Sequence, residues 1–451
     1  MKLSEHLDKG IWTALDKGLL LLYGFGVILV VVNVLKPEEW GIFSLFQSFF
    51  LILCVLSDSI FLQPMVKFAS EHEAEVEEVL AASFNLYTFF MLLTGAIIAI
   101  LSGWLSHVYK STELGTMLMM MPLLISLHIF RNVGIRYLQI TYRIKAIFWV
   151  DLGLFGSVVV MAVVAGMMGW FHNATQFMQM NMIGGAISSI IALGLGWKGF
   201  RKMPLFNVPR GEYSRLINFA KFQAGTSALL TLQQWSDVLI VGLFWKPAEV
   251  AVYTAAKTIY RFLDAVREGA TLLVVPVSSK LYTAKENVSL RTLVEKLLLL
   301  GFFGLVPISI VLIAIAPQLI HIIYKGKYDA AAPVFQVMML SGFTLPLSLI
   351  GTNVLIGIGK AKSLFLSTIG ATLIFFIMCF SLVPIMASMG AALAVFVSMT
   401  ALGVFTYIAM RKEVDTTFRG TLVHAISARH GLMLKLRARK QAKRDANAPE
   451  G

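Results

Sequence analysis

Twelve apolar segments recur along almost the whole chain, and they constrain its fold more than any other feature. Each is close to the roughly 20 residues that an α-helix needs to cross the apolar core of a bilayer. They lie near residues 12–35, 42–66, 81–106, 116–139, 146–168, 177–197, 216–243, 250–278, 293–316, 333–357, 363–385 and 388–410. Only 14% of the residues are charged, whereas soluble domains carry roughly 25%. We therefore predict an all-α polytopic membrane protein with about twelve transmembrane helices.

The chain also contains an internal repeat. The sequence Lys36-Pro-Glu-Glu-Trp-Gly-Ile-Phe-Ser44 is similar to Lys246-Pro-Ala-Glu-Val-Ala-Val-Tyr-Thr254, 210 positions later. A second pair of similar segments, 142–148 and 359–365, is offset by 217, and a longer loop in the second copy accounts for the difference. A chance match between short loops is the alternative interpretation. Two copies of one membrane unit are typical of transporters, in which the substrate path lies between the copies.

The positions of the basic residues predict the orientation in the membrane. With the N-terminus in the cytoplasm, cytoplasmic segments hold 29 of the 38 Lys and Arg residues, and the outer loops hold five. This bias places both termini in the cytoplasm. Six helices separate the two copies, so the repeat is parallel, with a pseudo-two-fold axis along the membrane normal. We predict a six-helix lobe over 1–200, a linker over 201–213, a second six-helix lobe over 214–412 and a basic cytoplasmic tail over 413–451.

Several functional classes are not expected. The predicted outer loops are too short for a catalytic domain, so we predict neither an enzyme nor a cofactor. Cys54 and Cys379 lie inside apolar segments and are expected to be buried thiols, with no disulfide and no metal site. The net charge of +13 follows mostly from the inward bias, so no nucleic-acid partner is expected. The basic tail is either an anchor on anionic membrane lipids or a solvated segment.

Ionisable residues inside membrane segments are the candidates for function, because each costs roughly 2.5–3.5 kcal/mol near the bilayer centre. They cluster in segment 250–278. At helical periodicity, Lys257, Arg261, Asp264 and Glu268 share one stripe, with Arg267 at its edge. This stripe is expected to line a polar cavity. Either its charges pair as a neutral staple between lobes, or its cations bind an anionic substrate while its acids tune or couple transport.

Other segments carry isolated charges. Asp237 follows Gln233 and Gln234 in segment 216–243, and Asp58 lies in segment 42–66. Arg131 is a deeper cavity candidate than Arg136, which is expected to extend to the cytoplasmic surface. Asp151 is expected at the membrane interface. The predicted anion-binding residues are thus Lys257, Arg261, Arg267 and Arg131, and the predicted residues for ion coupling or charge pairing are Asp58, Asp237, Asp264 and Glu268.

Several motifs resemble one family of membrane proteins. These are Lys325-Gly-Lys-Tyr-Asp-Ala-Ala-Ala-Pro333, Ile356-Gly-Ile-Gly-Lys-Ala-Lys362, Met389-Gly-Ala-Ala-Leu-Ala394, and Gly41-Ile-Phe-Ser44 with Pro64. Together they resemble the polysaccharide flippases of the MOP superfamily, over nearly the whole chain. The resemblance implies a MOP/MATE-like fold of two six-helix lobes around a central cavity that opens to each side in turn.

The resemblance also implies a substrate and partners. The substrate would be a polyprenyl-pyrophosphate-linked oligosaccharide, such as an O-antigen (lipopolysaccharide) or exopolysaccharide repeat unit, moved to the outer leaflet of the bacterial inner membrane. Partners would be this lipid-linked oligosaccharide, membrane lipids, and the polymerase and chain-length proteins of polysaccharide biosynthesis. The first two helices lack the mid-helix arginines of peptidoglycan-precursor flippases, so a peptidoglycan precursor is not expected.

Two other functions compete with this interpretation. A multidrug or cation antiporter of the same superfamily would use acids in the first lobe, yet the first helix has no acid at mid-membrane depth. A non-transport scaffold of polysaccharide assembly would not need charges in its bilayer core. Both alternatives are weaker than the flippase interpretation.

Overall fold

The computed structural model describes residues 3–71, 76–205 and 208–416. Within these ranges the chain forms helices joined by short turns, with no strand. The helices are α1 Leu3–Gly26, η1 Val27–Val32, α2 Pro37–Ser57, η2 Asp58–Leu62, α3 Gln63–Glu71, α4 Val76–Ile100, α5 Ser102–Val108, α6 Thr112–Met119, α7 Met121–Ile140, α8 Ile144–Met167, α9 Ala174–Lys202, α10 Arg210–Phe244, α11 Pro247–Tyr260, α12 Phe262–Thr283, α13 Asn287–Tyr324, α14 Ala331–Met339, η4 Leu340–Phe343, α15 Leu345–Gly357 and α16 Ala361–Val414. Most of the predicted basic tail lies outside the described residues.

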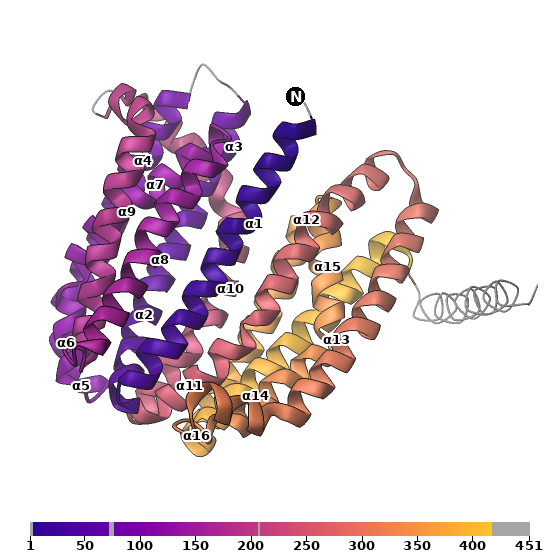
Figure 1. Ribbon diagram of the computed structural model, residues 1–451. Coiled ribbons are helices and arrows are strands. Elements are labelled where there is room, and N and C mark those ends of the chain that lie inside the picture. The colour runs from indigo at the N-terminus through magenta and orange to yellow at the C-terminus, as the bar shows by residue number, and fades with distance from the viewer. Residues whose placement is uncertain (1–2, 72–75, 206–207, 417–451) are drawn as a thin grey trace, which may run out of the picture. The chain divides into compact units, whose positions relative to one another are not determined.

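The predicted helical membrane architecture is confirmed. Each of the twelve apolar segments coincides with a helix, with a run of two or three consecutive helices, or with one half of α16 (Figure 1). Of the described helices, seven are long and apolar enough to span a membrane, and nine are when each of two bent pairs counts as one span. The α16 helix contains two of the predicted spans, because its backbone leaves the helical conformation at Ala387 (φ 50°, ψ −133°).

The chain divides into two compact units. Unit 1 comprises Met1–Tyr260, Ile315–Met338 and Thr372–Val395, and unit 2 comprises Arg261–Ala314, Met339–Ala371 and Phe396–Gly451. The boundaries cut through α13 and α16, so they follow packing density and not whole helices. The division into lobes at 1–200 and 214–412 stays a prediction.

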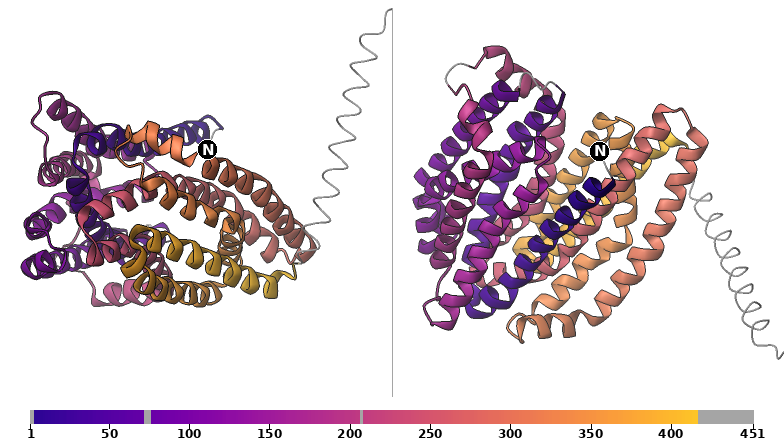
Figure 2. Two further views of the ribbon diagram at one scale, coloured as in Figure 1. Left: turned by 90° about the horizontal axis from the view of Figure 1, so that it is seen from below. Right: turned by 45° about the horizontal axis from the view of Figure 1, so that its top comes forward.

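Unit 1 contains both copies of the repeated motif, 36–44 and 246–254, and the two motifs pack directly against each other. Its helices α1 to α9, indigo to magenta in Figures 1 and 2, run side by side, and α2 lies against both α10 and α11. Ser44 on α2 donates a hydrogen bond to Thr254 on α11 (3.2 Å). These two residues are equivalent in the repeat, so the pseudo-two-fold axis passes close to this hydrogen bond. At Gly41 a side chain is excluded, because a Cβ atom there would lie 1.8 Å from the carbonyl oxygen of Pro247.

The repeat extends to the glutamate that follows each Lys-Pro turn. Glu39 accepts a hydrogen bond from the backbone N–H of Ala174 (2.8 Å), at the start of α9. Its counterpart Glu249 accepts from the N–H (3.3 Å) and the hydroxyl (2.5 Å) of Ser388, where α16 resumes after Ala387. Unpaired N–H groups at a helix start favour a carboxylate. Both glutamates therefore stabilise the start of the last helix of their own copy.

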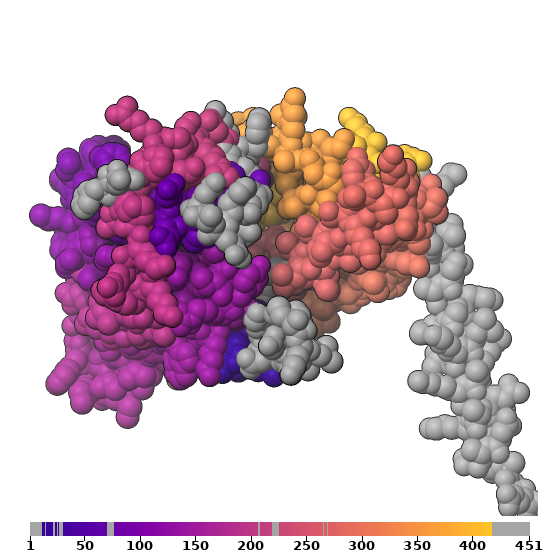
Figure 3. All heavy atoms as spheres, turned by 90° about the horizontal axis from the view of Figure 1, so that it is seen from above, coloured from indigo at the N-terminus to yellow at the C-terminus, as the bar shows by residue number. Residues whose placement is uncertain are grey.

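One end of unit 1 includes the turns at residues 33–36, 109–111, 245–246 and 325–330, and is called here the loop-36 end. It is the lower end in Figure 1, near the labels α5, α6, α11 and α14. Figure 3 shows the opposite end as spheres. The pair Tyr109-Lys110 recurs here as Tyr324-Lys325, and both lysines have a φ of 53°. Between this pair and the next helix the first copy has only Ser111, whereas the second has residues 326–330.

Unit 2 is held together by close backbone contacts between α12 and α15. A Cβ atom on Gly357 would lie 2.8 Å from the carbonyl oxygen of Val275, so the glycine permits this packing. The turn after α15 contains Gly359 with a φ of +75°, a conformation that favours glycine at the end of a helix. Lys360 then pairs with Glu413 near the end of α16 (2.9 Å), and this hydrogen bond raises the pKa of Lys360.

Candidate substrate site

The first group of predicted site residues forms a buried charge centre between α10 and α11 in unit 1. The ammonium of Lys257 donates to both carboxylate oxygens of Asp237, at 2.7 and 2.6 Å, and to the carbonyl oxygen of Gln234. Tyr253 donates a hydrogen bond to the same carboxylate (2.5 Å). Asp237 is 1% exposed and Lys257 is 7% exposed. This centre of Asp237, Tyr253 and Lys257 is neutral and closed to solvent, so an anion can reach Lys257 only by displacing Asp237.

One polar side chain near this centre is unsatisfied. Gln233 lies one helical turn from Asp237 on α10, on the same face. It is 3% exposed, and neither its amide nitrogen nor its amide oxygen has a hydrogen-bond partner among the described residues. Buried amides normally find partners. The amide of Gln233 is thus available to form new hydrogen bonds if α10 and α11 rearrange.

The second group lies at the start of α12, in unit 2, and is called here the Arg267 cluster. It comprises Arg261, Asp264 and Arg267. The guanidinium of Arg267 donates to Asp264 (2.8 Å), and Arg261 approaches the other carboxylate oxygen at 3.7 Å. The side chains of Arg261 and Arg267 are 48% and 30% exposed. Asp264 is thus contacted by two guanidinium groups, both of which are partly exposed.

The predicted stripe on segment 250–278 is interrupted at Arg261. The helix there divides into α11 and α12, and the N–H of Asp264 bonds to the carbonyl oxygen of Arg261 in a tighter turn. Lys257 pairs with Asp237 on α10, whereas Arg261 and Arg267 pair with Asp264 on their own helix. The side chain of Glu268 lies outside the described part of the structure.

A third group, in the first half of unit 1, surrounds Arg131. Its guanidinium on α7 pairs with Asp151 on α8, at side-chain exposures of 15% and 9%. Asp151 is buried and paired with Arg131 two turns into α8, and its expected depth at the membrane interface stays a prediction. The carboxyl group of Asp16 on α1 lies close enough to interact electrostatically with both Asp151 and Arg131. Asp16 was missed because it lies at the polar start of the first apolar segment.

A fourth pair joins Asp58 to Arg136. Two guanidinium nitrogens of Arg136 donate to the two oxygens of Asp58, at 2.9 and 2.6 Å. Asp58 begins η2, a π-helical turn between α2 and α3. Such turns often lie at functional sites. Arg136, which was expected to extend to the cytoplasmic surface, is thus engaged by a carboxylate that is 78 positions away in the sequence.

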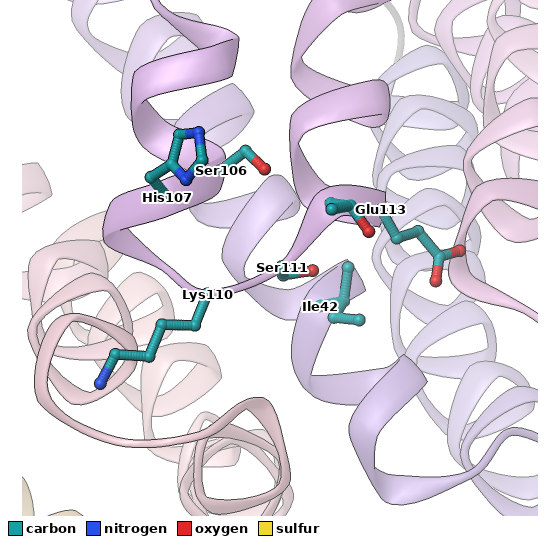
Figure 4. A pocket seen from close by; sticks show the side chains of 7 residues that line it. Ile42, Ser106, His107, Lys110, Ser111 and Glu113 are labelled. Atoms are coloured by element: carbon teal, nitrogen blue, oxygen red, sulfur yellow. The ribbon is translucent and has the colours of Figure 1, made fainter.

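A pocket of about 520 Å³ opens at the loop-36 end. Its lining residues are Ile42, Ser106, His107, Lys110, Ser111, Thr112 and Glu113. Glu113 accepts hydrogen bonds from the N–H and the hydroxyl of Thr175 (3.1 and 2.9 Å), and Lys110 points away from Glu113 (Figure 4). Since Glu113 already stabilises the start of α9, this pocket is a weaker candidate for an anion than the Arg267 cluster.

The fold resembles solved transporters of the MOP superfamily. An inward-facing multidrug-resistance MATE transporter is 14% identical, with a TM-score of 0.72 over 87% of this chain and 94% of its own. The lipid II flippase MurJ, in an inward closed conformation, is 14% identical, with a TM-score of 0.71 over 99% of this chain and 94% of its own. A MOP transporter from Pyrococcus furiosus with a binding pocket of reverse polarity is 14% identical, with a TM-score of 0.60 over 90% and 94%. At these identities the likeness defines the fold alone: the chain has the helical membrane fold of these transporters.

Sequence comparison assigns the chain to a family. The profile of the family described as "Polysaccharide biosynthesis protein" matches residues 30–333, and the chain belongs to this family. An uncharacterized membrane protein of Methanocaldococcus jannaschii is 34% identical over 128 residues, which are 28% of this chain. That alignment spans only 24% of the length of this relative. The predicted resemblance is confirmed at the level of a polysaccharide-biosynthesis family and of a MOP-like fold.

Proposed function

We propose that the protein moves a polyprenyl-pyrophosphate-linked oligosaccharide, such as an O-antigen or exopolysaccharide repeat unit, across the cytoplasmic membrane by alternating access. Family membership supports a role in polysaccharide biosynthesis, and the fold supports a transporter and not an enzyme. The observation that carries the choice of substrate is the Arg267 cluster, which brings two partly exposed guanidinium groups together at one carboxylate. Arginine suits phosphate because its planar fork donates two parallel hydrogen bonds.

In this proposal the clusters have different roles. Arg261 and Arg267 hold the pyrophosphate, and Asp264 orients both guanidinium groups when no substrate is bound. The closed centre of Asp237, Tyr253 and Lys257 and the Arg131–Asp151 pair are paired charges that change partners during transport. Both termini lie in the cytoplasm, and the loop-36 end faces outward. Polymerase and chain-length proteins would receive the product there.

Substitutions in the Arg267 cluster test the proposal. In the Arg267→Ala and Arg261→Ala variants, we expect surface polysaccharide to fall at least about tenfold, because a charge-assisted hydrogen bond contributes roughly 1.5–3 kcal/mol. The amount of protein in the membrane should not change. Arg267→Lys should restore only part of the activity, since lysine keeps the charge but not the fork. Lys280→Ala, an exposed cation in the last turn of the same helix, is the matched control. Normal polysaccharide in both arginine variants would contradict the proposed site.

A further inference from the structure

Lys327 connects the two copies of the repeat at the loop-36 end. Its ammonium donates to the carbonyl oxygens of Val32 (3.2 Å) and Asn33 (3.3 Å) and to that of Leu35. These carbonyls end the first membrane helix, where the helix dipole is negative. The carboxylate of Glu38, in the following helix, adds a Coulombic attraction. A single side chain from the second copy thus binds the end of the first helix and is attracted by an acid at the start of the next.

The rest of the 325–330 turn is fixed to the second copy. Tyr324 is fully buried and donates a hydrogen bond to the carbonyl oxygen of Ala255 on α11 (2.9 Å). The rings of Tyr324 and Tyr328 meet edge to face at 5.2 Å. Lys327 therefore projects from a rigid support. The first copy has only Ser111 at the equivalent place. It therefore has no lysine there that could bind the second copy in the same way.

Lys327 is partly buried, and the cost of desolvating its ammonium argues against a purely stabilising role. Burial lowers the pKa of Lys327, and Glu38 only partly opposes this effect. An ammonium removed from water needs an excellent set of partners to balance its desolvation, and apolar residues of similar size often stabilise a protein as well or better. Carbonyls at a helix end can also bond to water once the lysine leaves. The contact is therefore one that can be made and broken at a low net cost.

We infer that Lys327 is a latch that holds the loop-36 end closed and must release the end of the first helix before the transporter can open there. The inference rests on the alternating access of the proposed function. Two further contacts close at the same end, the Ser44–Thr254 hydrogen bond and the Gly41–Pro247 packing. Lys327 joins the two copies at the same end of unit 1 as these two contacts. Its release would let α2 and α11 separate.

The rate at which a thiol reacts at the α2–α11 contact tests the latch. Cys54→Ser and Cys379→Ala remove the native cysteines, and Ser44→Cys then places a thiol at a position that is 4% exposed. The purified full-length protein is treated with a small water-soluble maleimide. Lys327→Met should raise the labelling rate at least about fivefold, the change expected for 1 kcal/mol of lost closure. Lys325→Met, in the same turn but exposed, should leave the rate unchanged.

Two results would overturn the latch: equal labelling in the Lys327→Met variant and its parent, or an equal rise in the Lys325→Met variant. Lys327→Arg, which can donate to the same carbonyls, should label as slowly as the parent, and this result separates a lost latch from a misfolded protein. The labelling assay needs no substrate. If labelling behaves as expected but vesicles do not translocate a lipid-linked oligosaccharide, the result supports the latch and contradicts the proposed substrate. If translocation occurs while Lys327→Met does not change labelling, the reverse holds.

Discussion

Each described cation predicted to lie inside the membrane has a carboxylate partner. Lys257 pairs with Asp237, Arg131 with Asp151, and Arg261 and Arg267 with Asp264. The cost of a charge in the bilayer core allowed these residues to be picked out from the sequence. Their partners Asp237, Asp151 and Asp264 were recognisable as well, but most of the pairings were not, because pairing depends on which helices are neighbours. Helical periodicity shows which residues share a face, but not what that face contacts.

The pairing of Lys257 with Asp237 can be measured as a coupling energy. Asp237→Asn leaves a buried ammonium without a counter-charge, and we expect a loss of about 3–5 kcal/mol in the free energy of unfolding. In the double variant Asp237→Asn/Lys257→Met, most of this loss should be recovered, since no unpaired charge remains. Denaturant unfolding of the purified protein and its three variants gives the double-mutant cycle. Additive losses would show that the two side chains are not coupled.

At the scale of helices, the number of apolar segments was predictable and the breaks within them were not. Twelve segments were recognisable because each needs about 20 apolar residues. The bends between α6 and α7 (46°) and between the α14–η4 run and α15 (52°) come just before Pro122 and Pro346, which suit the first turn of a new helix. The break at Arg261 has no proline or glycine beside it. It coincides with the boundary between the two units, and periodicity alone could not reveal it.

The two glutamates that stabilise helix starts should differ in importance. The N–H groups at the start of α9 have three acceptors, Glu39, Glu113 and Asn173. At the restart of α16, Glu249 is the one acceptor within the described residues for both donors of Ser388. Glu249→Ala should therefore cost about 0.5–2 kcal/mol, in the range of a lost helix cap, and Glu39→Ala should cost less. Thermal unfolding of both variants in the same detergent checks the order. A larger loss for Glu39→Ala would contradict it.

For the whole molecule, the repeat accounts for the similar helices of the two copies. The differences between the copies show where the proposed functional residues lie. At an offset of 210 the residues Lys257, Arg261, Asp264 and Glu268 correspond to Gln47, Leu51, Cys54 and Asp58. Only the last position keeps its charge. The first copy therefore lacks an equivalent of the Arg267 cluster, just as it lacks an equivalent of the Lys327 turn. Duplication supplied two similar bundles, and the residues proposed for substrate and latch lie in the second.

The charge of the proposed substrate predicts how the membrane potential affects the whole transporter. Moving about two negative charges outward across an inside-negative membrane releases roughly 2.3 kcal/mol per charge for each 100 mV. In proteoliposomes with a potassium diffusion potential, transfer of the lipid-linked oligosaccharide should accelerate when the cytoplasmic side is negative and slow when the potential is reversed. Export of an organic cation would respond with the opposite sign, so the same measurement separates the two transporter classes. A rate that responds neither to the potential nor to collapse of proton and sodium gradients would refute coupling to both.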